Sequence, residues 1–200
     1  MGDAATKAWM SHEACLALER STDQRYEWFD GHIYAMAGGT VAHAALAGAI
    51  IGELRALSLG CDCLVLSSDA KLRVLATGLA TYPDGSVVCG PLSTDPSDAN
   101  VITNPTLVFE VLSDSTEGYD RGKKFENYQQ IPSLRDYVLV SQYAKRIEVF
   151  SREGEGQWTL RVAGAGQSVP LTAMAGVIEV DRVYAGIPLT SESRGGAATG

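Results

Sequence analysis

Apolar residues recur along the chain with two spacings, one typical of helices and one typical of strands. Residues 8–20 and 41–59 carry apolar side chains three and four positions apart, which predicts two amphipathic helices. Thr40 is the expected N-cap of the second helix and Gly60 its expected end. Five residues of that helix are expected to share one buried face: His43, Ala47, Ile50, Leu54 and Leu57.

Strand patterns account for most of the remaining chain. Residues 26–37 predict a β-hairpin that turns at Asp30–Gly31, a pair typical of two-residue hairpin turns. Further strands are expected within 61–67, 70–75, 80–89, 105–116, 135–141, 145–151, 157–163 and 176–184. A helix over about 119–130 should end near Pro132, and the polar segment 90–104 is expected to be a loop. The fold class is therefore predicted to be α/β or α+β, with a mixed central sheet in one domain.

Length and composition agree with one folded domain. The chain has 200 residues, of which 46% are hydrophobic and 20% charged, and this is ordinary globular composition. No run of about 18 apolar residues predicts a membrane span. The first twenty residues do not show a basic start followed by an apolar core, so we expect no signal peptide and a cytoplasmic protein.

The net charge is −8, which argues against a protein held on nucleic acid by a broad basic surface. It does not exclude an enzyme that meets nucleic acid locally and relies on metal ions for positive charge. Cys61 and Cys63 could be half of a zinc site, but there is no second cysteine pair, and no histidine stands at a finger-like spacing. The favoured interpretation is that Cys61 and Cys63 are small apolar residues on a strand in a reducing cytoplasm.

The most informative acid is Glu110, which lies inside the apolar stretch "PTLVFEVLSDST". An unpaired carboxylate buried in such a strand costs on the order of 3–5 kcal/mol, so Glu110 needs a partner or a proton. Because side chains alternate along a strand, Val108, Glu110 and Leu112 share one face. A structural ion pair with a lysine or arginine is one explanation, and a bound cation is another.

Asp84 lies in similar surroundings, in "ATYPDGSVVCG". Pro83 predicts an edge or an irregular point in the strand, and Gly85 is expected to leave room for a ligand or another backbone. Two acids on two apolar strands are compatible with a shared Mg²⁺, which prefers oxygen ligands. Taken alone, Asp84 is better explained as a turn aspartate after proline.

The helix after the Glu110 strand carries Asp120, Lys124 and Tyr128 four residues apart, which places them on one stripe. If this helix folds back over the sheet, it brings Lys124 to the carboxylates. The alternative is a plain surface ion pair between Asp120 and Lys124, which contributes only a few tenths of a kcal/mol.

Several segments together resemble a known family. "YEWFDGHIYAMAGGTVAH", "YPDGSVVCG", "LVFEVLSDST", "DRGKKFENY" and "DYVLVS" occur in the order and spacing of the Uma-two family of restriction endonucleases, within the PD-(D/E)XK nuclease superfamily. The resemblance covers roughly residues 12–188. It implies a restriction-endonuclease-like core, with residues 1–190 forming a single nuclease-like domain and residues 191–200 a disordered tail.

The resemblance also implies roles for individual residues. Asp84 and Glu110 match the two acids of the family, which are expected to be catalytic and to bind the metal. The superfamily pattern places the catalytic lysine two residues after the second acid, where this chain has Leu112. Lys124 matches a lysine displaced to the next helix, and Lys123 is its less favoured neighbour. Four residues match supporting positions: Glu27, His43, Asp120 and Tyr128.

The implied function is a Mg²⁺- or Mn²⁺-dependent endonuclease that cleaves nucleic acid, with DNA as the expected substrate and no membrane partner. His43 could contact the substrate or carry a proton, and a structural histidine is as good an explanation. Arg121 and Lys123 are candidate phosphate contacts. A monomer and a homodimer both remain open. The main alternative is an inactive nuclease-fold module for binding or assembly; a glycosidase is disfavoured because it leaves Lys124 without a role.

Overall fold

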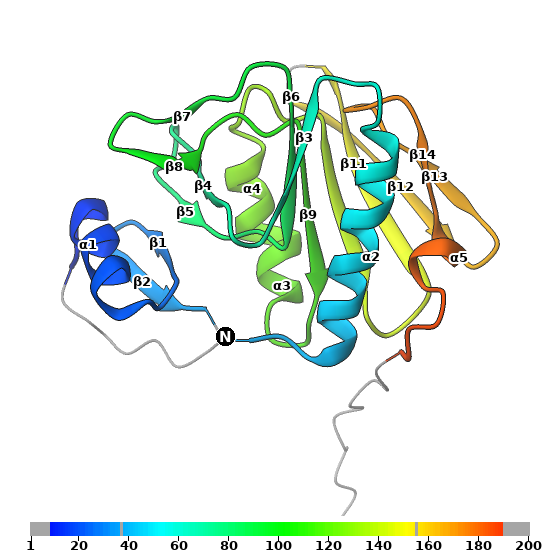
Figure 1. The fold of residues 1–200 in the computed structure, drawn as a ribbon, viewed down its shortest axis with the longest axis horizontal. Helices are drawn as coiled ribbons and strands as arrows, with labels where there is room; N and C mark the ends of the chain where they lie inside the picture. The colour runs from blue at the N-terminus through cyan, green and yellow to red at the C-terminus, as the bar shows by residue number, and fades with distance from the viewer. Residues whose placement is uncertain (1–8, 37, 155, 190–200) are drawn as a thin grey trace, which may run out of the picture.

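The computed structural model describes residues 9–36, 38–154 and 156–189 (Figure 1). The disordered tail predicted for residues 191–200 lies outside the described residues. The helical segments are α1 His12–Thr22, α2 Val41–Leu57, α3 Glu117–Tyr119, the π-helical segment η1 Asp120–Lys124, α4 Phe125–Tyr128 and α5 Val180–Val183. Among the described residues, no helix combines the length and the apolar character that a membrane crossing requires.

The main sheet has six strands in the order β12-β11-β10-β9-β6-β3. Its strands are β3 Cys63–Ser67, β6 Gly85–Cys89, β9 Leu107–Leu112, β10 Asp136–Ser141, β11 Arg146–Gly154 and β12 Gln157–Gly164. The central pair β9 and β10 is parallel, whereas the other neighbours are antiparallel. The predicted mixed sheet is therefore confirmed.

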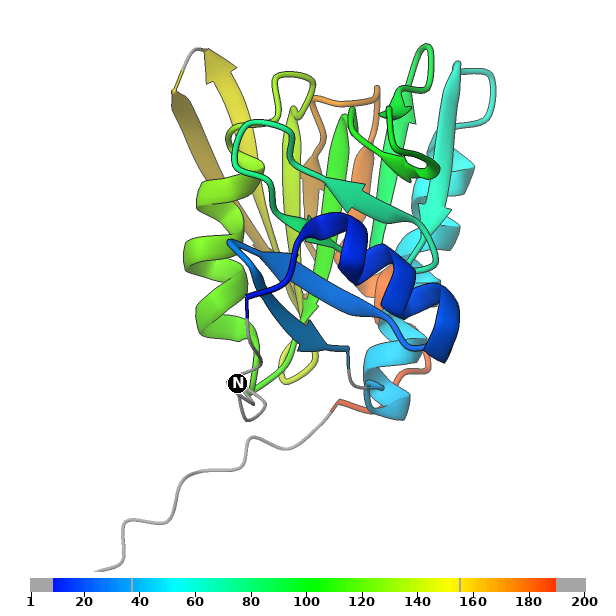
Figure 2. The same ribbon diagram turned by 90° about the vertical axis from the view of Figure 1, so that its left-hand side faces the viewer.

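A second sheet, with the order β2-β1-β5-β4-β8-β7, gathers the N-terminal half of the chain. Its strands are β1 Tyr26–Phe29, β2 His32–Ala35, β4 Lys71–Arg73, β5 Ala80–Thr81, β7 Thr94–Asp95 and β8 Asp98–Ile102. A further pair, β13 Ser168–Pro170 and β14 Val177–Glu179, leads to α5. In Figure 2 the second sheet and α1 lie across the main sheet, in front of it.

The main sheet has a hydrophobic core on each face. On one face α2 packs Leu46, Ile50 and Leu54 against strand residues that include Phe109 and Val111. On the other face, α4 and the second sheet cover the β9 residues whose side chains point in the opposite direction, Val108 and Leu112. Figure 2 shows α2 and the α3–α4 segment on opposite sides of the main sheet. Glu110 belongs to the α4 face, because it alternates with the residues of the first core.

Short sequence patterns predicted the first hairpin and the start of α2 correctly. The predicted hairpin is present, and both turn residues have the positive φ that a two-residue turn requires, 47° at Asp30 and 79° at Gly31. The Thr40 side chain caps α2 by accepting a hydrogen bond from the backbone nitrogen of His43 at 3.1 Å. The predicted buried face of α2 was partly wrong, since the buried stripe is Ala42, Leu46, Ile50 and Leu54. His43 lies beside that stripe and is half-buried.

Three other expectations need correction. The loop predicted at 90–104 contains the strands β7 and β8. Polar side chains there have partners: the buried Asp95 accepts a hydrogen bond from Arg73 at 2.7 Å. The strand predicted at 176–184 ends at Glu179 and continues as α5, because Val180 and Val183 are both buried at helical spacing. The single strand predicted at 80–89 is divided into β5 and β6, which belong to different sheets.

The expectation that Cys61 and Cys63 are both reduced was wrong for Cys63. Cys63 and Cys89 are directly opposed on the antiparallel pair β3 and β6, and they form a disulfide. Neighbouring strands bring such cross-strand partners together although they are 26 residues apart in sequence. Cys61 is a free, exposed cysteine and Cys15 a free, buried one.

Candidate active site

Asp84 lies where the chain leaves the second sheet and enters the main sheet. Residues 82–84 separate β5 from β6, so the backbone is irregular here, as Pro83 predicted. The space expected beside Gly85 is filled, because a Cβ atom there would lie 2.3 Å from the Phe109 ring. The glycine therefore allows β6 to approach β9 closely, and it does not form a ligand pocket.

Two hydrogen bonds link Asp84, just before β6, with the part of β9 that carries Glu110. The Asp84 oxygen Oδ2 accepts a hydrogen bond from the Val111 backbone nitrogen at 2.7 Å. In return, the Asp84 backbone nitrogen donates to Glu110 Oε2 at 3.3 Å. Each acid is thus bound to the strand that carries the other, and the structure brings the two together as predicted.

Lys124 reaches the same place from the helical segment that follows β9. Its ammonium nitrogen is 2.8 Å from Glu110 Oε1 and 3.4 Å from Asp120 Oδ1. Tyr128, one turn further along, donates a hydrogen bond to Glu110 Oε1 at 2.9 Å. The Lys124 side chain is 6% exposed, so the alternative of a solvated surface ion pair is wrong.

The helix that carries Lys124 is not regular. The segment is kinked within η1, where Gly122 has φ −109° and ψ −105°, outside the helical region. The stripe predicted from a spacing of four residues is still formed, because Lys124 contacts both Asp120 and Glu110, and Tyr128 also contacts Glu110.

Glu27 joins the cluster from β1 of the second sheet. It is 6% exposed, and its carboxylate accepts hydrogen bonds from Tyr119 and from the Thr81 hydroxyl, the latter at 2.6 Å. The Glu27 charge also helps to raise the pKa of Lys124, which places it near the ammonium. Sequence reasoning did not find Thr81 or Tyr119, since isolated hydroxyl residues carry no recognisable pattern.

His43 completes the predicted set from the N-terminal part of α2. Its Nε2 atom is 3.2 Å from Asp84 Oδ2. The hydrogen bond to Asp84 raises the pKa of His43, although burial opposes the shift. Both side chains are about one-fifth exposed, so this is the solvent-accessible side of the cluster.

The electrostatics follow from the presence of several carboxylates around one ammonium. Burial raises the pKa of Glu110 from 4.5 to about 8, and Asp120 and Asp84 add to the shift while Lys124 opposes it. Burial alone would lower the pKa of Lys124, but the charges of Glu110 and Asp120 raise it well above its ordinary value. Lys124 therefore stays protonated at neutral pH, and the metal-free site retains an additional proton on a carboxyl group.

This shift predicts how the stability of the metal-free protein depends on pH. A carboxyl group with a raised pKa binds more protons in the folded than in the unfolded state between the two pKa values. The stability that protonated Glu110 contributes is therefore present below pH 4.5 and is lost as the pH rises toward about 8. The free energy of unfolding should fall by roughly 1 kcal/mol for each pH unit in this window.

Urea denaturation in EDTA at several pH values between these limits measures the slope. Glu110→Gln should flatten it, because glutamine does not titrate. Glu179→Gln, which changes an exposed acid outside the site, should retain the wild-type slope. Equal slopes for Glu110→Gln and the wild type would contradict the assignment of the proton to this cluster.

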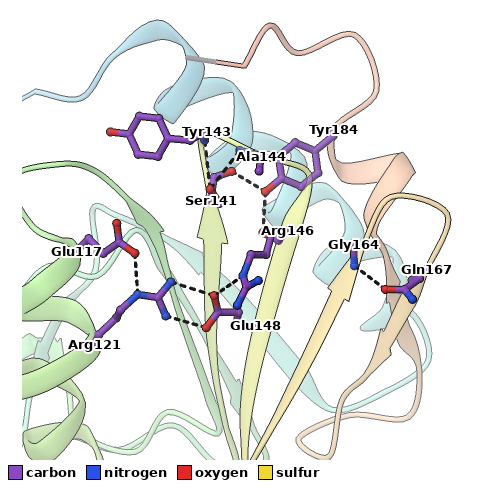
Figure 3. A network of polar contacts seen from close by, with 10 residues as sticks. All are labelled: Glu117, Arg121, Ser141, Tyr143, Ala144, Arg146, Glu148, Gly164, Gln167 and Tyr184. Carbon is purple, nitrogen blue, oxygen red and sulfur yellow. Dashed lines mark hydrogen bonds and ion pairs between the residues drawn. The ribbon is translucent and has the colours of Figure 1, made fainter. Parts of the chain in front are cut away.

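A second network fixes the lysine helix to the sheet (Figure 3). Arg121 donates two hydrogen bonds to the buried Glu148 of β11, at 2.7 and 2.9 Å, and one to Glu117 at 2.7 Å. Glu110 and Glu148 are both paired with Leu139 in the sheet register, so they lie in one row across three strands. Arg121 and Lys124, three residues apart, thus contact different acids of that row. The positive charge of Arg121 is therefore balanced by acidic side chains of the protein itself, so no phosphate is needed to explain this arginine.

The comparisons with known proteins identify the family of the chain. A family model described as "Putative restriction endonuclease" matches residues 12–181. The chain belongs to this family, the Uma-two family.

Two Synechocystis proteins are relatives of this Uma-two chain. The uncharacterized protein slr1290 is 36% identical over 184 residues, which cover 89% of this chain and 93% of that protein. The uncharacterized protein sll1609 is 32% identical over 158 residues, or 78% of this chain and 88% of that protein. The crystal structure of a "putative nuclease" from Anabaena variabilis superposes with a TM-score of 0.66 at 14% identity. That match covers 82% of this Uma-two chain and 91% of the other, and it shows a shared fold.

Proposed function

We propose that this Uma-two protein is a metal-dependent endonuclease that hydrolyses phosphodiester bonds of nucleic acid, with DNA as the expected substrate. The observation that carries the proposal is the meeting of Asp84, Glu110 and Lys124 at the junction of the two sheets. A buried cluster of acids with one lysine has little value for stability alone, since its desolvation offsets its Coulomb energy. Perturbed groups gathered beside a cavity are typical of functional sites.

The donor atoms suit Mg²⁺ or Mn²⁺. Asp84 and Glu110 offer carboxylate oxygens, the ligands that these hard cations prefer. In the described part of the chain, no three acidic, histidine or cysteine side chains are arranged to hold a metal. Magnesium usually takes only one or two carboxylates from a protein and completes its shell with water and substrate phosphate, so this set fits. When bound, such an ion would polarise the phosphoryl group and lower the pKa of water.

The protein residues would have distinct tasks around that ion. Asp84 and Glu110 would hold it, and the backbone nitrogen of Val111 fixes the orientation of the Asp84 carboxylate. Lys124 remains an ammonium, so it would act as a hydrogen-bond donor that orients water and stabilises charge at the phosphate, and not as a base. Asp120 and Tyr128 hold Lys124 and Glu110 in place.

The direct test is incubation of the purified full chain with plasmid DNA, single-stranded DNA and RNA in the presence of Mg²⁺, Mn²⁺ or EDTA. We expect cleavage with a metal ion, none in EDTA, and none by Asp84→Ala with either ion. Internal cuts in the circular plasmid would identify an endonuclease. Failure of the folded wild type to cut any of the three substrates would favour the binding or assembly module.

A further inference from the structure

A cavity of about 420 Å³ opens on the accessible side of the candidate active site. Asp84, His43, Arg25 and Tyr82 line it. The rest of the lining comes from α2, which includes Gly48, from residues 36, 38 and 39, and from Ser68. The cavity therefore lies against both the acid expected to hold the metal and one face of a helix.

The charges around this cavity suit a phosphate. Arg25 is held beside the Tyr82 ring, with its guanidinium carbon 5.4 Å from the ring centre. Its acidic partner, Asp69, has a side chain that is 76% exposed. Exposed ion pairs of this kind contribute little, so the guanidinium can exchange that carboxylate for a phosphate, which it binds well. His43 also lines the cavity, beside Asp84, and its imidazole ring offers an N–H donor for a phosphate oxygen.

A larger neighbouring cavity, of about 630 Å³, is less suitable. It shares Arg25 and Tyr82 with the first, but four acids and three cations line it. Those acids are Glu19, Asp23, Asp69 and Asp98, and the cations are Arg20, Arg25 and Lys71. Lys71 is already paired with Glu19 at 2.7 Å, and Arg20 with Asp98 at 2.8 Å. An anionic strand is therefore favoured in the smaller cavity.

The part of α2 that lines the cavity includes a glycine, Gly48, which the packing of the helix does not require. Glycine is unfavourable inside a helix relative to alanine. A Cβ atom at Gly48 would meet nothing within 4 Å, so no close packing demands the glycine. A large side chain at this position would instead extend into the cavity. Gly52, one turn further along α2, is equally open but does not line it.

We propose that this cavity receives one unpaired nucleotide next to the scissile phosphate, with Arg25 and His43 on its phosphate group. The volume is near the lower end of the range for small-ligand sites, about 300–1,000 Å³, and this suits one nucleotide better than a base pair. The inference rests on the proposed nuclease function and deepens it, since it names single-stranded or locally unpaired nucleic acid as the substrate class.

The test is the affinity for a fluorescent single-stranded DNA oligonucleotide, measured by anisotropy with Ca²⁺ at several salt concentrations, with cleavage monitored on gels. Gly48→Leu should weaken binding about tenfold or more by filling the cavity. Arg25→Ala should weaken it about tenfold and reduce the salt slope by roughly one, because one phosphate contact is lost.

Matched controls separate these effects from general damage. Gly52→Leu makes the same change on the same helix outside the cavity. Arg161→Ala removes an arginine from another exposed ion pair, with Glu153 at 2.9 Å. Both should bind within about twofold of the wild type, and thermal unfolding should show that all four variants fold.

The outcomes distinguish this inference from the proposed function. A wild type that cleaves nucleic acid, with Gly48→Leu and Arg25→Ala behaving like their controls, would overturn the cavity assignment alone. If a perfectly paired duplex bound as tightly as the single strand, and Gly48→Leu weakened the binding of both equally, the inference of an unpaired nucleotide would be overturned. A folded wild type that neither binds nor cleaves any nucleic acid would overturn both proposals.

Discussion

Lys124→Ala should lower the rate of cleavage by on the order of 10²-fold or more at saturating metal, the scale of a lost electrostatic contact to the transition state. Lys124 is not expected to bind the metal, so the variant should still bind Mg²⁺. It should also lose stability in EDTA, because Glu110 and Asp120 would remain buried without their cation, at a cost of about 3–5 kcal/mol. Single-turnover cleavage measures the first effect, and urea denaturation with and without metal measures the second.

Lys123→Ala is the matched control for this experiment. Lys123 is adjacent in sequence but exposed, outside the buried cluster that holds Lys124. Its removal should leave stability unchanged and reduce cleavage severalfold at most, through the loss of a long-range phosphate contact. If the two variants cleaved equally well, the assignment of Lys124 to the catalytic site would be wrong.

Asp84→Asn should abolish measurable Mg²⁺ and Mn²⁺ binding, and cleavage with it. The amide oxygen of asparagine can still accept the hydrogen bond from Val111, so the local backbone should be preserved. Loss of one negative charge beside Glu110 should stabilise the metal-free fold slightly. Isothermal titration calorimetry measures the binding, and thermal unfolding in EDTA measures the stability.

Asp62→Asn provides the corresponding control, since Asp62 is an exposed acid just before β3. It should bind metal like the wild type and unfold at the same temperature. Unchanged metal affinity in Asp84→Asn would remove Asp84 from the proposed site, whatever the cleavage rate of the variant.

The elements that could be predicted from sequence are those with a local cause. The turn at Asp30–Gly31 needs two residues with positive φ, and the Thr40 cap needs a side chain that accepts from the first turn of α2. Both requirements are visible in a few adjacent letters. The buried strand predicted that Glu110 needs a partner, but the gathering of Asp84, Glu110 and Lys124 was expected from the family resemblance. The spacing alone favoured a surface ion pair between Asp120 and Lys124.

The features that were missed depend on contacts between distant segments. The disulfide between Cys63 and Cys89 follows from the register of β3 and β6, which no local pattern specifies. The strand β8 carries a strand-like apolar pair only at its end, Val101–Ile102, and it forms because it pairs with β4 and β7. The helix kink at Gly122 lies between two groups of contacts, from Lys124 to Glu110 and from Arg121 to Glu148, so it too depends on the sheet.

The position of Glu27 has a consequence for how the protein folds. The side chain joins Tyr119, which is 92 residues away, and Thr81, which is 54 residues away. Contacts between such distant residues form slowly, because closing a long loop costs entropy before the contact compensates for it. The strands β9 and β10 and the helix between them can assemble from residues that are close in sequence. Glu27, in contrast, reaches the cluster only when the hairpin of β1 and β2 has docked on the rest of the protein. We therefore expect the acid cluster to close late in folding, after the main sheet has formed.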